Sequence, residues 1–159
     1  MRASTLAMTA GTVFATGALG GFASRPGRSQ WYVKLKKPGF QPPSQAFGIV
    51  WPMLYADIAA VSASTIDHYN DIGQPEKARA YTTALVANLI LNGSWSWLFF
   101  NRHKLAVSAV AAGALAASSA DLTRRAVEAK GAQAAALGLY PLWCGFATAL
   151  SSRIWWLNR

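Results

Sequence analysis

Residues 31–55 read WYVKLKKPGFQPPSQAFGIVWPMLY, and the stretch changes character half-way along. Its first half carries Lys34, Lys36 and Lys37 among three prolines. Its second half, from Ser44 onward, contains no charged residue before Asp57. Prolines end one regular segment and lead well into the start of a helix. A basic, proline-rich connection that opens directly into an uncharged apolar stretch is typical of the border of a membrane span.

The same arrangement recurs along the whole chain of 159 residues, of which 53% are hydrophobic and only 13% charged. About 20 apolar residues are needed to cross a bilayer as a helix. A soluble domain of this size could not cover several such segments, so we predict an all-α integral membrane bundle of five transmembrane helices. The second span reaches full length only by continuing past Asp57. The single domain, 1–159, has expected helices at 3–23, 44–68, 76–100, 105–128 (extended by a polar end) and 132–157, with Pro141 as a kink and a long loop at 24–43.

The first apolar window allows a second interpretation, as a secretory signal peptide, because Arg2 precedes it and small residues follow it in GGFASRPG, residues 20–27. The window is long for a signal-peptide core, and its Gly17-x-x-x-Gly21 spacing suits close packing of membrane helices. Cys144, the only cysteine, can form no internal disulfide.

The net charge of +9 could indicate a nucleic-acid partner. The bases, however, lie in the connections between spans, where they orient a membrane protein. We therefore expect membrane lipid as a partner, and we expect no nucleic-acid partner. Because positive charge favours the cytoplasmic side, the N-terminus is predicted outside and the C-terminus inside. Nine bases fall on the C-terminal side (Arg25, Arg28, Lys34, Lys36, Lys37, Arg102, Lys104, Arg153, Arg159) and six on the other (Arg2, Lys77, Arg79, Arg124, Arg125, Lys130).

Three of the expected helices carry aromatic stripes at the helical period. Facing inward, these stripes would wall a pocket for a large planar apolar ligand, although aromatic stripes in bundles also serve simply as packing. Asn88 and Asn92, on one of them, are amides that lipid would not tolerate. Trp155 and Trp156 fit an interfacial aromatic belt. The stripes are Phe47, Trp51, Leu54 and Ile58; Asn88, Asn92, Trp95 and Phe99; and Leu139, Trp143, Phe146, Ala147 and Leu150.

Several motifs occur in a recognisable order between residues 31 and 158: WYVKLKKPGFQPP, FGIVWPMLY, Asn92-x-x-Trp95 with Phe99-Phe100, LWCGFATALS and a final WLN. With these marks the chain resembles the tryptophan-rich sensory protein family, also called the translocator or peripheral benzodiazepine receptor family. The resemblance implies a five-helix membrane fold, usually dimeric, that binds porphyrins, isoquinoline-type drugs and, in animal members, cholesterol.

Carried over residue by residue, the resemblance places ligand contacts at Trp51, Asn92, Trp95, Trp143 and Ala147. Phe47, Phe146 and Leu150 share faces with them, and the loop with Trp31 and Tyr32 would act as a lid. No cofactor is required, and porphyrin is the expected ligand. Stacking would hold its flat body, while Lys34, Lys36 or Lys37 could meet its propionates; these lysines are equally explained as topology signals.

The chain departs from the family pattern at Tyr140-Pro141, where many members have Pro-Tyr, at Leu150-Ser151, and at Asp57, a usually apolar position. Asp57 is about 120° from Trp51 on the helix, and we expect it inside the bundle or at a subunit contact. Without a tyrosine near Arg153, sterol binding is expected to be weak.

Motifs for catalysis are missing from the sequence: it has no phosphate loop, no nucleophile set and no metal-ligand cluster, and His68 and His103 fall at opposite ends of the fold. Three function classes remain. A receptor or sensor that binds porphyrin is preferred, a tetrapyrrole transporter is the first alternative, and a weak light-dependent porphyrin-degrading enzyme is the second.

Overall fold

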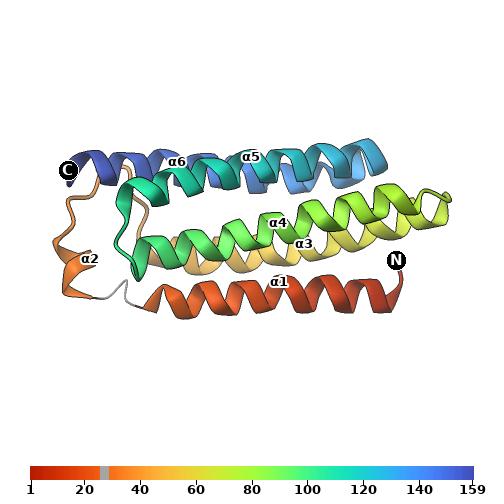
Figure 1. Cartoon of the computed structure of the whole chain (residues 1–159), viewed down its shortest axis with the longest axis horizontal. Helices are drawn as coiled ribbons and strands as arrows, with labels where there is room; N and C mark the ends of the chain where they lie inside the picture. Colours follow the sequence, from red (N-terminus) through yellow and green to blue (C-terminus); the bar gives the residue numbers. More distant parts are fainter. Residues whose placement is uncertain (26–28) are drawn as a thin grey trace.

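The computed structural model describes residues 1–25 and 29–159, and Arg28 of the predicted lid lies outside them. Within the described ranges five long helices run side by side, and one short helix lies across their end (Figure 1). The elements are α1 (Ala3–Ala23), α2 (Gln30–Lys34), α3 (Ser44–Asp71), α4 (Pro75–Phe100), α5 (Leu105–Lys130), the 3-10 helix η2 (Gly131–Gly138) and α6 (Leu139–Leu157).

The membrane-spanning character of these helices follows from length and composition. Four stretches are long and apolar enough to cross a bilayer, and the last of them, Leu105–Leu157, contains two crossings. Gly131, with a φ of 57°, reverses the chain there, so that η2 packs back on α5 and α6 runs antiparallel to it (Figure 1). The prediction of an all-α membrane bundle with five spans is therefore confirmed.

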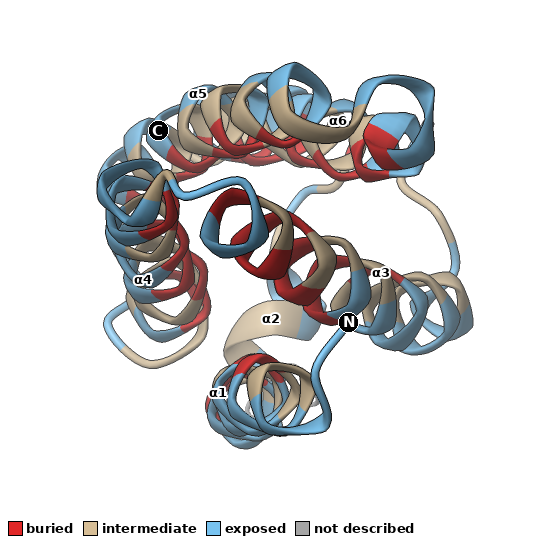
Figure 2. Ribbon diagram, turned by 90° about the vertical axis from the view of Figure 1, so that its right-hand side faces the viewer, coloured by how far each residue is buried: buried red, intermediate tan, exposed pale blue. Residues whose placement is uncertain are grey.

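The centre of the bundle is α3, which contacts α1, α4, α5, η2 and α6. Buried positions line the inward side of each long helix, while the outward sides stay exposed (Figure 2). Large apolar side chains on the outside, such as Leu19, Ile90 and Val110, are 63–73% exposed. In a protein of five apolar helices this outer surface is the one that faces lipid.

Of the predicted pair of glycines on α1, Gly17 allows a close approach to α3 and Gly21 does not. A Cβ added at Gly17 would lie 2.7 Å from Cε2 of Tyr55, so this position requires glycine. Gly21, in contrast, has nothing within 4 Å, whereas a Cβ added at Gly20 would lie 3.5 Å from Oγ of Ser96 on α4, an ordinary contact. The inward spacing on α1 is thus three residues, which fits one helical face as well as a spacing of four.

Two helix boundaries differ from the sequence prediction for tertiary reasons. α3 continues three residues beyond His68 because Tyr69 is buried and its hydroxyl donates to the carbonyl oxygen of Arg125 at 3.3 Å. The fifth span begins not as an α-helix but as η2, and Pro141 lies in the first turn of α6. A proline in a first turn lacks only an N–H that would have no intrahelical partner. The change in helix geometry therefore precedes Pro141.

The predicted lid, residues 24–43, contains the short helix α2 and lies over the end of the bundle that also holds the C-terminus and the α4–α5 connection (Figure 1). Trp31 stacks on His103 of that connection, with ring centroids 3.8 Å apart. The side chain of Asn158 accepts from the backbone N–H of Lys36 at 2.9 Å and donates to its carbonyl oxygen at 2.9 Å. The lid is therefore held at both its start and its middle.

Candidate functional site

Aromatic side chains from α3 and α6 meet beneath the lid. The rings of Phe47 and Trp143 lie edge to face with centroids 5.6 Å apart, and Trp143 contacts Phe146 of its own helix at 5.4 Å. Trp51 stacks on Tyr55 one turn along α3, at 5.5 Å. Backbone contact between α3 and α6 is sparse, so aromatic rings form much of what joins these two helices.

α4 and the lid contribute a second aromatic group. Trp95 stacks on Phe99 with centroids 5.7 Å apart, and the lid residues Trp31 and Tyr32 contact the same Phe99 ring at 6.0 and 6.2 Å. Phe99 is buried, and it forms one apolar cluster with Leu150 of α6. The lid thus lies directly on the aromatic end of α4.

The residues predicted to form the site fall into two adjoining clusters. Trp51 and Trp143 pack against the central core, whereas Leu150, Phe47, Phe146, Trp31 and Tyr32 belong to the cluster around Phe99. The contact between Phe47 and Trp143 joins the two. Ala147, one turn beyond Trp143 on α6, is half-buried. The inward aromatic stripes therefore come together near the lid, with their rings in contact with one another.

Asn92, predicted as a ligand contact, is a member of a buried hydrogen-bond chain. Its Oδ1 accepts from the hydroxyl of Tyr55 at 3.0 Å, and its Nδ2 donates to the hydroxyl of Tyr140 at 3.1 Å. Tyr140 in turn donates to Oδ1 of Asn88 at 2.8 Å, and Asn88 donates to Ser118 at 3.2 Å. The chain connects α3, α4, α5 and α6, and satisfies both amides in a region where unpaired polar groups are costly.

Sequence reasoning noted Tyr140 only as a departure from the family pattern, and it missed Tyr55 as a partner of Asn92. A signal was nevertheless present. Two inward amides on one membrane helix require donors and acceptors from facing helices, and tyrosine hydroxyls are the longest-reaching neutral groups that supply both.

Two indole N–H groups of predicted site residues have no hydrogen-bond acceptor among the described residues. Nε1 of Trp95 and Nε1 of Trp143 are both shielded from solvent and unpaired. Buried N–H donors are usually satisfied, by protein, water or ligand. Of the polar atoms near the lid, Oε1 of Gln41 is likewise shielded and without a partner. These shielded groups can bond to an added molecule without breaking an existing hydrogen bond.

Asp57 lies on α3 and is half-buried. Its Oδ2 is shielded and has no hydrogen-bond partner among the described residues.

Two cavities of the structure are not lined by the predicted site residues. One, of about 680 Å³, lies along α1 and α4, and the other, of about 330 Å³, lies at the end of the bundle opposite the lid.

The lysines of the lid differ in their availability. Lys37 is half-buried, its Nζ donates to the carbonyl oxygen of Tyr32 at 2.7 Å, and it lies 4.3 Å from the centre of the Tyr32 ring. Lys34 and Lys36 are exposed. Two of the three lid lysines can therefore reach a ligand without giving up a bond. Groups of three or more metal-ligating side chains do not occur in the described part of the chain.

Comparison with known proteins identifies the family of the chain. The model of the TspO/MBR family matches residues 9–157, which include most of α1 and all of the other four long helices. The chain belongs to the TspO/MBR family. Membership supports a receptor- or sensor-type role in a membrane. Together with the long apolar helices, it confirms the prediction of an integral membrane protein.

Three relatives illustrate the breadth of the TspO/MBR family around this chain. It is 30% identical over 129 residues to the uncharacterized membrane protein YtaB of Bacillus subtilis, covering 81% of each chain. It is 30% identical over 128 residues to the tryptophan-rich protein TspO of Bacillus cereus, covering 80% of each. The translocator protein of Ovis aries is 30% identical over 136 residues, which are 82% of this chain and 76% of that protein.

Proposed function

We propose that the chain is a membrane receptor or sensor that binds porphyrins and related flat apolar ligands between α3, α4 and α6, beneath the lid. The observation that carries the proposal is the pair of unpaired indole N–H groups, on Trp95 and Trp143, each in contact with further aromatic rings. Rings supply stacking surface for a planar body, and the N–H groups supply donors for its polar edge.

The ligand would enter by separating rings that now touch. Phe47 and Trp143 hold the sparse contact between α3 and α6, so a planar molecule inserted there replaces ring-to-ring contacts with ring-to-ligand contacts. Lys34 and Lys36 remain exposed at the lid, where the anionic propionates of a porphyrin would lie. Asn92 positions Tyr55 and Tyr140 by its two hydrogen bonds, and Tyr55 in turn supports Trp51. Only the second amide hydrogen of Asn92 remains for a contact with the ligand.

A spectral titration of purified protein tests the proposal. We expect a porphyrin with two propionates to bind saturably and to quench tryptophan emission, and its dimethyl ester to bind more weakly, because the ester removes the anionic groups. A linear, unsaturable signal for both compounds would contradict the proposal. Retention of bound porphyrin by proteoliposomes without its passage across the bilayer separates a receptor from a transporter.

Two further properties are proposed, a dimer from the resemblance and an orientation from the charge distribution. A dimer would need an apolar face between copies, and the groove along α1 and α4 provides small residues at Gly93 and Ser94 with exposed Trp97 beside them. The orientation is proposed with the C-terminus in the cytoplasm, on the charge distribution described above.

A further inference from the structure

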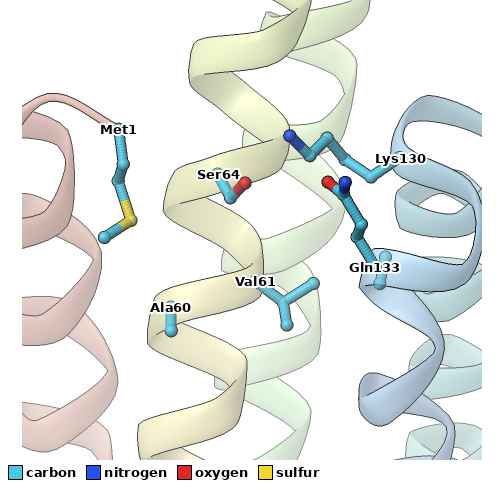
Figure 3. A pocket seen from close by; sticks show the side chains of 7 residues that line it. Met1, Ala60, Val61, Ser64, Lys130 and Gln133 are labelled. Carbon is cyan, nitrogen blue, oxygen red and sulfur yellow. The ribbon is translucent and has the colours of Figure 1, made fainter.

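A second cavity lies at the end of the bundle opposite the lid, between the start of α1, the outer face of α3 and the α5–η2 junction (Figure 3). We call it the Lys130 cavity; its volume is about 330 Å³. Its lining is mostly apolar, with three polar side chains that lie close together: Ser64 of α3, Lys130 at the end of α5 and Gln133 of η2 (Figure 3). The complete lining is Met1, Ala60, Val61, Ser64, Lys130, Gln133 and Ala134.

Lys130 differs from every other base at this end of the molecule. It is half-buried, and no acidic or aromatic partner is within contact distance of its ammonium group among residues 1–25 and 29–159. The other five bases all have a partner. Arg2 pairs with Asp71, Arg79 with Glu76, Arg124 and Arg125 with Asp121, and Lys77 lies over the ring of Tyr69.

A half-buried cation without a counter-ion favours an anionic ligand. Around the ammonium group, the hydroxyl of Ser64 and the amide of Gln133 can donate to the remaining oxygens of that anion (Figure 3). The rest of the lining is apolar, and a free, fully hydrated ion would fit it poorly. The chemistry indicates an anion with an apolar part attached to it.

The outer face of α3 continues from the cavity as an exposed apolar track. Ala60, Ala56, Met53 and Ile49 follow one another at intervals of four, three and four residues and are all exposed, Met53 by 67% and Ile49 by 62%. Such spacing keeps them on one side of the helix. A hydrocarbon chain that starts at the cavity therefore finds a continuous apolar surface of about 16 Å along α3.

We propose that the Lys130 cavity holds the phosphate of an anionic phospholipid, with the acyl chains lying along the Ile49–Ala60 face of α3. The volume fits a head group and not a whole lipid, which agrees with chains that remain in the bilayer. The site is separate from the aromatic site, because it lies at the opposite end of α3 and shares no lining residue with it.

Native mass spectrometry of the full chain in detergent, titrated with phosphatidylglycerol or phosphatidylcholine, tests this proposal. We expect phosphatidylglycerol to bind more tightly and Lys130→Gln to weaken it about fivefold, since a base near an anionic surface contributes about 1 kcal/mol. Lys77→Gln, which removes the same charge at the same end, is the matched control and should leave binding unchanged. Equal loss in both variants, or none in either, would overturn the site.

A steric variant tests the same site without a change of charge. Ala60→Trp fills the cavity from an exposed position, where the fold tolerates a large apolar side chain, and should displace phosphatidylglycerol. Millimolar inorganic phosphate should not compete, and full competition by it would replace the lipid with a free anion. A shift from dimer to monomer in Ala60→Trp, with lipid binding intact, would assign this face to a second copy of the chain instead.

Discussion

Tyr140 shows how a single hydroxyl can decide the order of a membrane core. It accepts from Asn92 and donates to Asn88, so both of its hydrogen-bonding functions are used, and it is completely buried. Without it, each amide would lose one partner in a region that water does not reach.

Tyr140→Phe should therefore destabilise the bundle by about 1–2 kcal/mol, the range for hydrogen bonds between membrane helices and for unsatisfied buried groups. Thermal unfolding in detergent measures the change. Tyr69→Phe is the matched control, because its hydroxyl makes a single, longer bond to Arg125. Equal losses in the two variants would show that the amides find other partners.

The indole N–H of Trp143 gives a second prediction at this scale. Trp143→Phe keeps an apolar ring and removes the donor, and we expect porphyrin affinity to fall about fivefold, or roughly 1 kcal/mol. Trp156→Phe, at an exposed position over which the Arg159 guanidinium lies, should leave affinity unchanged. The double variant Trp51→Ala, Trp143→Ala should weaken binding further and abolish any light-dependent loss of the porphyrin band. Unchanged titrations in the folded double variant would place the ligand elsewhere.

At the level of single residues, the sequence predicts inward aromatic and amide positions well because the helical period alone determines which residues share a face. It does not predict which hydroxyl meets which amide. Asn92 and Tyr140 are 48 residues apart, and their pairing depends on how far α6 is rotated and shifted against α4. That information resides in the packing of the whole bundle.

Between elements, the approach of α1 to α3 depends on Gly17. A methyl group there would overlap the ring of Tyr55, which is itself held by its stack on Trp51 and its bond to Asn92. We expect Gly17→Ala to lower stability by about 1–3 kcal/mol, as overpacking does, and to disturb the tyrosine. Gly21→Ala, with open space around it, should be neutral or slightly stabilising, because alanine is the better helix former. Unfolding curves of Gly17→Ala and Gly21→Ala in the same detergent test this prediction, and equal stability of the two variants would contradict it.

The lid depends on a second contact between elements, the two hydrogen bonds from Asn158 to the backbone of Lys36. Asn158→Ala removes both, and we expect faster hydrogen exchange across residues 29–37 and faster porphyrin release, with less effect on association. Asn70→Ala, an exposed change at the opposite end, serves as control. Identical release rates in the two variants would show that the stack of Trp31 on His103 suffices to hold the lid.

Element boundaries were predictable where uncharged windows and prolines coincide. α1 and the starts of α3 and α4 agree with the prediction to within one residue. The 3-10 geometry of η2 was not predictable, because its sequence, GAQAAALG, consists of residues that an ordinary helix would also accept.

Across the whole molecule, charge is divided unequally between the two ends. Eight of the nine bases of the lid end lie in the described part of the chain, and none of the eight forms an ion pair there. The six bases of the other end share it with five acids: Asp67, Asp71, Glu76, Asp121 and Glu128. The sixth acid, Asp57, lies within α3. Ion pairs neutralise most bases at the far end, whereas the described bases at the lid end stay unneutralised. This difference agrees with an orientation in which the lid end faces the cytoplasm.

A reporter fused after Arg159 tests that orientation. We expect a reporter that works only in the cytoplasm to be active there, and one that works only outside to be silent. Replacing the lid bases Lys34, Lys36 and Lys37 with glutamine should produce a mixed population. The reverse pattern of reporter activity in the unaltered chain would refute the orientation.

The 3-10 stretch η2 has a consequence for the thickness of bilayer that the protein fits. A 3-10 helix rises about 2.0 Å per residue against about 1.5 Å for an α-helix. The 27 residues of η2 and α6 therefore extend about 44 Å, close to the roughly 42 Å of the 28 residues of α3. As a regular α-helix they would reach about 40 Å, slightly less than α3. Because of this 3-10 stretch, the crossing made of η2 and α6 is slightly longer than α3 although it has one residue fewer. Since the hydrogen bonds of a 3-10 helix have the poorer geometry, bilayers a few ångströms thinner or thicker should strain η2 first.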